Sequence, residues 1–151
     1  MGFWDNLKGS MNQMNDSLRG KISQFKNSDF ANGAMAMCAL VAAADGSIDT
    51  AERHKTASFI MANDMLKVFP ASELRDKFDL YCDKLNKDFD FGKIEAIQTI
   101  AKLKKKEDQA RAVIQVGIII GGADGNFDSG EKKVVREACN AVGINPAEFD
   151  L

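Results

Sequence analysis

The sequence predicts an all-α protein, with about seven helices in a single bundle-like domain that has two pseudo-symmetric halves. Apolar residues recur at helical spacing, and no stretch sustains the period-two alternation of a half-buried strand. The chain has 151 residues, of which 45% are hydrophobic, 28% are charged and only 2 are prolines, a composition typical of one globular helical domain. An acidic octapeptide occurs twice, and such a repeat suggests an internal duplication.

The N-terminal segment, residues 1–27, is predicted to contain an amphipathic helix over residues 3–25. Its apolar stripe follows steps of three and four and consists of Trp4, Leu7, Met11, Met14, Leu18 and Phe25, flanked by Phe3 and Ile22. We expect this stripe to pack on the core formed by residues 28–151. Because basic residues outnumber acidic ones in the segment, contact with a membrane surface or a partner helix is the alternative.

Two nearly all-apolar helices are expected at residues 30–44 and 109–122. Both have almost no polar face, so both should be buried on most sides and form the centre of the bundle. Each leads through an acidic turn into a more polar helix. The first of these polar helices should run from about residue 50 to residue 63, and the second should end at Gly143.

The region between the two acidic turns is predicted to contain two further helices. One begins at Pro70, and the other follows a loop at residues 88–92, in which an aspartate would act as a cap. A lysine run at residues 102–106 should be a solvated helix end, with an acidic partner or a phosphate as the alternative. The chain should close with a short turn at residues 145–149.

The repeated octapeptide reads DGSIDTAE at residues 45–52 and DGNFDSGE at residues 124–131. In each copy the glycine can adopt the left-handed conformation that ends a helix. The second aspartate, Asp49 or Asp128, suits the N-cap of the next helix. The glutamate three residues later would complete a capping box, and each cap stabilises its helix by about 1 kcal/mol. This interpretation leaves the first aspartate of each copy without a role.

The octapeptide also matches the second half of an EF-hand calcium loop. Neither copy is an EF-hand, because loop positions 1 and 3 would be occupied by side chains that cannot ligate a cation, namely Val41, Ala43, Ile120 and Gly122. If the two halves pack about a pseudo-two-fold axis, both copies could share one cation. The carboxylates that would hold it are Asp45, Asp49, Glu52, Asp124, Asp128 and Glu131. Oxygen ligands favour Ca²⁺, Mg²⁺ or Mn²⁺, and no organic cofactor is expected. Helix capping alone is the alternative.

Composition argues against several other classes of function. The net charge of −2 disfavours a nucleic-acid binder. The three cysteines are widely spaced, which favours reduced core thiols in a cytoplasmic protein, and a single histidine, His54, makes a zinc site improbable. No stretch has the length of a membrane span, and the N-terminus lacks a signal peptide, so we expect a cytoplasmic location.

The sequence resembles the bacterial tellurite-resistance TerB family over essentially its whole length. The resemblance rests on the opening MGFWD, the apolar helix at residues 30–44 with its acidic turn, the segments VGI at 116–118 and ADGNFD at 123–128, and the ending NPAEFDL at 145–151. The middle, about residues 63–109, matches only in its helical character. The second acidic motif and the C-terminus are the most specific parts.

This resemblance implies an all-helical fold and a role in resistance to tellurium oxyanions and in related stress defence. It also implies a metal-binding function at the acidic motifs, where all six carboxylates are present, and partnership with Ter-system proteins that include an integral membrane protein. We therefore expect a non-enzymatic, metal-binding adaptor that is cytoplasmic, with association with the inner face of the membrane as a further expectation. The alternative is a peripheral membrane or partner-docking module without intrinsic metal binding. A hydrolase is disfavoured because no nucleophile–base pair accompanies the carboxylates, and tellurite reduction by three scattered thiols is also disfavoured.

Overall fold

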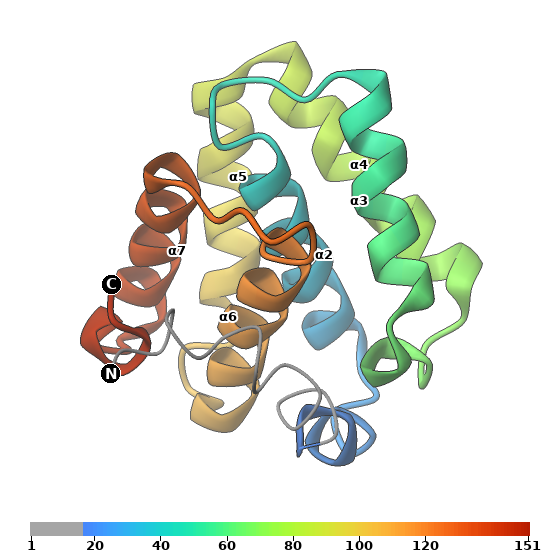
Figure 1. Ribbon diagram of the computed structural model, residues 1–151. Coiled ribbons are helices and arrows are strands. Elements are labelled where there is room, and N and C mark those ends of the chain that lie inside the picture. Colours follow the sequence, from blue (N-terminus) through green and yellow to red (C-terminus); the bar gives the residue numbers. More distant parts are fainter. Residues whose placement is uncertain (1–16) are drawn as a thin grey trace.

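The computed structural model describes residues 17–151, and within this range all regular secondary structure is helical (Figure 1), which confirms the predicted all-α class. Residues 17–22 form one helical segment. The elements that follow are α2 (Ser28–Ala42), α3 (Thr50–Ala62), the 3-10 helix η1 (Asp64–Leu66), α4 (Ala71–Lys87), α5 (Phe89–Ala101), α6 (Glu107–Gly121), α7 (Ser129–Val142) and the 3-10 helix η2 (Pro146–Phe149).

Helix α2 lies at the centre of the bundle and packs against each of the α-helices α3 to α7. Between Phe30 and Val41 every residue except Asn32 is buried. A helix that is apolar on all sides is stable only when other elements surround it, so its composition accounts for its central position. The prediction of a buried helix here is confirmed.

Helix α6 lies beside α2 and runs in the same direction (Figure 1). The two helices approach closely at Gly117, where a Cβ atom would lie 2.5 Å from Cγ of Met37. Because α2 and α6 are parallel, their C-terminal ends reach the same end of the bundle. Each helix is followed there by one acidic turn, so the packing of α2 on α6 brings the two repeated motifs together.

Helices α4 and α5 form a tight antiparallel hairpin, and here one boundary prediction was wrong. Residues 88–92 do not form a loop: α5 already begins at Phe89, and only Asp88 separates it from the end of α4 at Lys87. The Asp88 side chain caps α5 by accepting a hydrogen bond from the Phe91 amide at 3.1 Å. Gly92 permits the contact between the two backbones, because a Cβ there would lie 2.7 Å from the Lys84 carbonyl oxygen.

Part of the predicted N-terminal helix falls within the described residues. Leu18 and Ile22 are buried in the core, and the ring of Phe25 lies 5.5 Å from that of Phe30. The other apolar positions predicted for this stripe, from Phe3 to Met14, lie outside the described residues. The division of the chain at residue 27 stays a prediction.

The end of α7 and the terminal turn agree with the expectations from sequence. Gly143 ends α7 with a left-handed backbone, φ +73°, and Phe149 in the terminal turn is buried. Helix α4 begins at Ala71, and Pro70, which was predicted to start it, is its N-cap residue instead. The three cysteines are free and buried, and His54 is exposed. Among residues 17–151, no helix combines the length and the apolar character needed to cross a membrane.

Candidate functional site

The two acidic turns have the same backbone hydrogen bonds. The amide of Gly46 donates to the Ala43 carbonyl at 2.9 Å, and the amide of Gly125 donates to the Gly122 carbonyl at 2.9 Å. Both turn glycines have positive φ, +109° for Gly46 and +81° for Gly125, a conformation that favours glycine. The repeated sequence therefore gives a repeated local structure. The descent of the two halves from one duplicated unit stays a prediction.

The aspartates of each motif stabilise the turn and the helix that follows. Asp124 Oδ1 accepts the Asn126 amide at 3.0 Å, and Asp45 Oδ1 accepts the Ser47 amide at 3.3 Å. The predicted N-caps are confirmed: Asp49 Oδ1 accepts the Glu52 amide at 2.7 Å, and Asp128 Oδ1 accepts the Glu131 amide at 2.8 Å. One oxygen of each aspartate is thus engaged in local structure.

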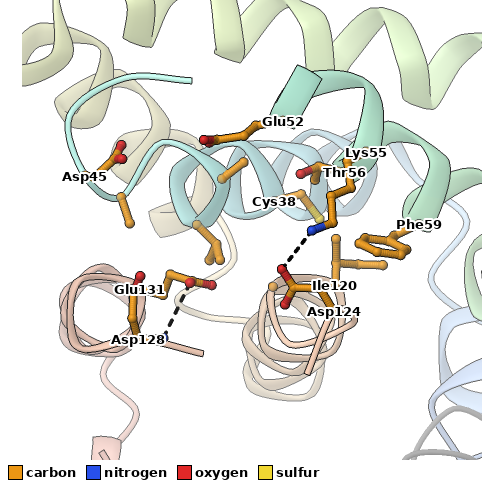
Figure 2. A pocket seen from close by; sticks show the side chains of 14 residues that line it. Cys38, Asp45, Glu52, Lys55, Thr56, Phe59, Ile120, Asp124, Asp128 and Glu131 are labelled. Carbon is orange, nitrogen blue, oxygen red and sulfur yellow. Dashed lines mark hydrogen bonds and ion pairs between the residues drawn. The ribbon is translucent and has the colours of Figure 1, made fainter. Parts of the chain in front are cut away.

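The second half of the capping box forms in only one of the two copies. Glu131 Oε1 accepts the Asp128 amide at 3.4 Å, which completes the box in α7. Glu52 forms no such bond, so the capping box predicted for α3 was wrong. The Glu52 side chain instead lines the space between the two acidic turns, as Figure 2 shows.

This space is a cavity of about 270 Å³ at the C-terminal ends of α2 and α6. The first motif contributes two carboxylates to its lining and the second contributes three, on the opposite side of the cavity (Figure 2). They are Asp45, Glu52, Asp124, Asp128 and Glu131. Asp49, the sixth predicted ligand, is not among the lining residues and caps α3 instead.

The carboxylates perturb one another electrostatically. Burial, together with the nearby charges of Asp128 and Asp124, raises the pKa of Glu131 from 4.5 to about 7, although the Asp128 amide opposes the shift. Burial and the charges of Asp49 and Asp45 also raise the pKa of Glu52. The cavity therefore holds more negative charge than its own cationic groups neutralise.

Asp124 differs from these glutamates because it has a cationic neighbour. Burial alone would raise its pKa, but the hydrogen bond from the Asn126 amide and the Lys55 ammonium group hold the pKa below its ordinary value. Lys55 Nζ lies 3.1 Å from Asp124 Oδ2 (Figure 2). The pair joins α3 to the turn that follows α6.

The donor set fits a hard divalent cation in its chemistry, because carboxylate oxygens are the preferred ligands of Ca²⁺, Mg²⁺ and Mn²⁺. The partial negative charges at the C-terminal ends of α2 and α6 favour a cation further. In the conformation observed for residues 17–151, no three Asp, Glu, His or Cys side chains are already grouped as a metal-ligand cluster. Ligation would therefore require rotamer changes, and Glu52 and Glu131 have the longest and most adaptable of the five side chains.

Comparison with known proteins identifies the family. The family model described as "Tellurite resistance protein TerB" matches residues 31–151. The protein named "Tellurium resistance protein TerB" from an Alcaligenes species is 30% identical over 118 residues, which cover 78% of this chain and 97% of that protein. The chain belongs to the TerB family. No solved structure matches the chain.

The TerB match covers both acidic turns and every residue that lines the cavity. It begins at residue 31, so the segment MGFWD, on which the resemblance was partly based, lies outside the matched region. Membership of the TerB family therefore rests on the helical bundle that contains the cavity.

The cavity is also lined by residues that no sequence pattern singled out. Lys55 follows Glu52 by three residues on the polar helix α3, and nothing in its local sequence pairs it with Asp124. Cys38, Thr56 and Phe59 line the cavity as well. Burial, followed by the proximity of Cys82, raises the pKa of the Cys38 thiol far above its ordinary value, so this thiol stays protonated at neutral pH.

Proposed function

We propose that this TerB family protein is a non-enzymatic adaptor that binds a divalent cation between its two acidic turns and acts in bacterial tellurite resistance and related stress defence. The observation that carries the proposal is the convergence of carboxylates from both motifs on one cavity. The printed name of the Alcaligenes relative supports the tellurium-resistance part. Ter-system proteins, including an integral membrane protein, are the proposed partners.

The residues proposed to hold the cation are those that face the cavity, Asp45, Glu52, Asp124, Asp128 and Glu131. Asp49 is a weaker candidate than the sequence suggested, because it would have to leave the α3 N-cap to reach the ion. Burial, together with the neighbouring carboxylates, raises the pKa of Glu131 and Glu52, and a bound cation would counter both by stabilising the ionised form. It would also join the turn after α2 to the turn after α6, and so stiffen one end of the bundle.

The proposed role is binding rather than catalysis. The thiol in the cavity, Cys38, is a poor nucleophile and a poor reductant because its raised pKa keeps it protonated. The second motif's aspartates already hold the backbone of their own turn and helix in place. A structural or partner-presenting site fits these constraints better than an acid–base pair that must exchange protons freely.

The test is a titration of the ¹⁵N-labelled protein with Ca²⁺, Mg²⁺, Mn²⁺ and Zn²⁺ while amide NMR signals are recorded. The proposal predicts that at least one of the first three cations shifts or broadens the amides of residues 45–52 and 124–131 together. A double variant, Glu52→Gln with Glu131→Gln, should lose the response, whereas Asp76→Asn, an exposed carboxylate on α4, should keep it. If none of the four cations changes the amide signals of either turn, the proposal that the protein binds a metal ion is wrong.

A second candidate function, docking on an anionic membrane surface, is favoured by a separate observation. Lys26, just before α2, and the lysines of residues 102–106, just before α6, are exposed. Both α2 and α6 begin at one end of the bundle and run toward their acidic turns (Figure 1). A hydrogen bond of 3.1 Å between Asn27 and Gln109 holds these two basic segments together. Sedimentation with phosphatidylglycerol vesicles discriminates: the adaptor proposal predicts no binding without a membrane protein, and the docking proposal predicts salt-sensitive binding.

A further inference from the structure

Lys55 extends into the acidic cavity from α3 and forms an ion pair across a long sequence separation. Its Nζ lies 3.1 Å from Oδ2 of Asp124, the first aspartate of the second motif (Figure 2). The other oxygen of Asp124, Oδ1, accepts the Asn126 amide. The oxygen that Lys55 engages is therefore the one that is not used by the turn itself. A cation entering the cavity would compete with Lys55 for this oxygen.

The remaining polar contacts of this region attach the first turn and α3 to α4. The Asn86 side chain donates to the Ile48 carbonyl and accepts from the Ile48 amide, both at 3.0 Å. The guanidinium group of Arg53 pairs with Asp83. Lys55 instead links α3 to the turn between α6 and α7. The ion pair thus spans the two sides of the cavity, which carry the first and the second acidic motif.

Helix α3 is held to the bundle by few apolar side chains. Of its thirteen residues only Ala57 and Ile60 are buried, whereas α7, the helix after the second turn, buries five. Phe59 is partly buried and lines the cavity beside Thr56. If the ion pair between Lys55 and Asp124 breaks, α3 therefore keeps few other contacts with the bundle on the side that faces the cavity.

We propose that Lys55 is the resident counter-cation of the acidic cavity, and that a divalent cation displaces its ammonium group from Asp124 into solvent. The inference rests on the proposed cation site and adds a competitor and a specificity determinant to it. The side chains of Lys55 and Asp124 are 55% and 35% exposed, so the pair is solvent-screened and weak enough to exchange. A divalent ion that several carboxylates hold together would outcompete it.

The test compares Mn²⁺ affinity, measured by isothermal titration calorimetry on the full chain, for wild type, Lys55→Gln and Lys67→Gln. Lys67 is the matched control, because it forms an exposed ion pair with Asp64 that does not line the cavity. Removal of the competing ammonium group should raise the Mn²⁺ affinity about three- to tenfold in Lys55→Gln, whereas Lys67→Gln should stay within about twofold of wild type. In wild type, Mn²⁺ should also increase acetylation of Lys55, measured by mass spectrometry.

The outcomes separate this inference from the proposed function. Binding of Mn²⁺ by wild type with unchanged or weaker affinity in Lys55→Gln would overturn the displacement proposal and leave the cation site standing. A decrease in the acetylation of Lys55 when Mn²⁺ is added would also overturn the displacement proposal and leave the cation site standing. Binding by Lys55→Gln but not by wild type would also overturn displacement, because the ammonium group would then exclude the cation. Absence of binding in all three proteins would overturn both proposals. Circular dichroism melting of each variant verifies that it is folded.

Discussion

Glu131 combines a structural and an electrostatic role in one side chain. It completes the capping box of α7, and burial together with the neighbouring carboxylates raises its pKa to about 7. The first role needs only an acceptor oxygen, which glutamine also offers, and the second needs the charge. Glu131→Gln therefore separates the two roles.

The pKa of Glu131 predicts a specific pH dependence of stability. Because this pKa rises from 4.5 in the unfolded chain to about 7 in the folded state, the folded protein binds the proton more tightly. Its contribution to stability is thus fully present below about pH 4.5 and is lost as the pH rises through 7. Relative to Glu131→Gln, the wild type should lose about 1 kcal/mol of unfolding free energy between pH 4.5 and 7.5, a figure reduced for the partial exposure of the group.

Urea denaturation of both proteins at several pH values measures this difference. Addition of a cation that binds the cavity should abolish the loss, because the ion stabilises the ionised carboxylate. A parallel pH dependence in wild type and Glu131→Gln would show that Glu131 titrates as an ordinary carboxyl group.

At the scale of the helices, close backbone contacts fix the hairpin of α4 and α5. The one-residue connection at Asp88 and the contact at Gly92 make α5 start earlier than the sequence suggested. Glycine and aspartate are typical turn residues, so the composition of residues 88–92 predicts a loop. Asp88 does have a cap's role, but Gly92 is a helical residue selected for its lack of a side chain. The tertiary contact of α5 with the backbone of α4 at Lys84 accounts for its helical conformation, and the turn-like composition of residues 88–92 does not contain that information.

Gly92→Ala should destabilise the protein by about 1–3 kcal/mol. The new Cβ would lie 2.7 Å from the Lys84 carbonyl oxygen, so the backbones of α4 and α5 must separate, and this cost exceeds the gain in helix propensity. Gly20→Ala is the matched control. Gly20 is helical and has nothing within 4 Å of an added Cβ, so its replacement should be neutral or stabilising by up to about 1 kcal/mol. Equal effects of the two substitutions in guanidinium denaturation would contradict this account of the hairpin.

At the scale of the whole molecule, the parallel packing of α2 and α6 creates the acidic cavity. The apolar composition of both helices predicted their burial, and the repeated octapeptide predicted two similar turns. Five of the six carboxylates selected from sequence line the cavity. Asp49 and Glu52 show the limit of the pattern. The motif is the same in both copies, but one glutamate caps its helix and the other does not, because side-chain direction depends on tertiary surroundings.

Lys55 could not have been selected from sequence for the same reason. A lysine on a polar helix usually faces solvent, and its partner Asp124 is 69 residues away. The two halves also differ in how firmly the helix after the turn is buried, since α3 buries two residues and α7 five. The similarity of the two turns is thus local, and the cavity between them is asymmetric.

The central claim is that both acidic turns contribute to one shared cation site. The most direct measurement is the stoichiometry of Mn²⁺ binding by isothermal titration calorimetry, in wild type and in two variants that each remove carboxylates from one turn. These are Asp45→Asn with Glu52→Gln, and Asp124→Asn with Glu131→Gln. A shared site predicts one ion per chain in wild type and a loss of affinity of at least about tenfold in either variant. Two ions per chain, with each variant retaining one unaltered site, would contradict it.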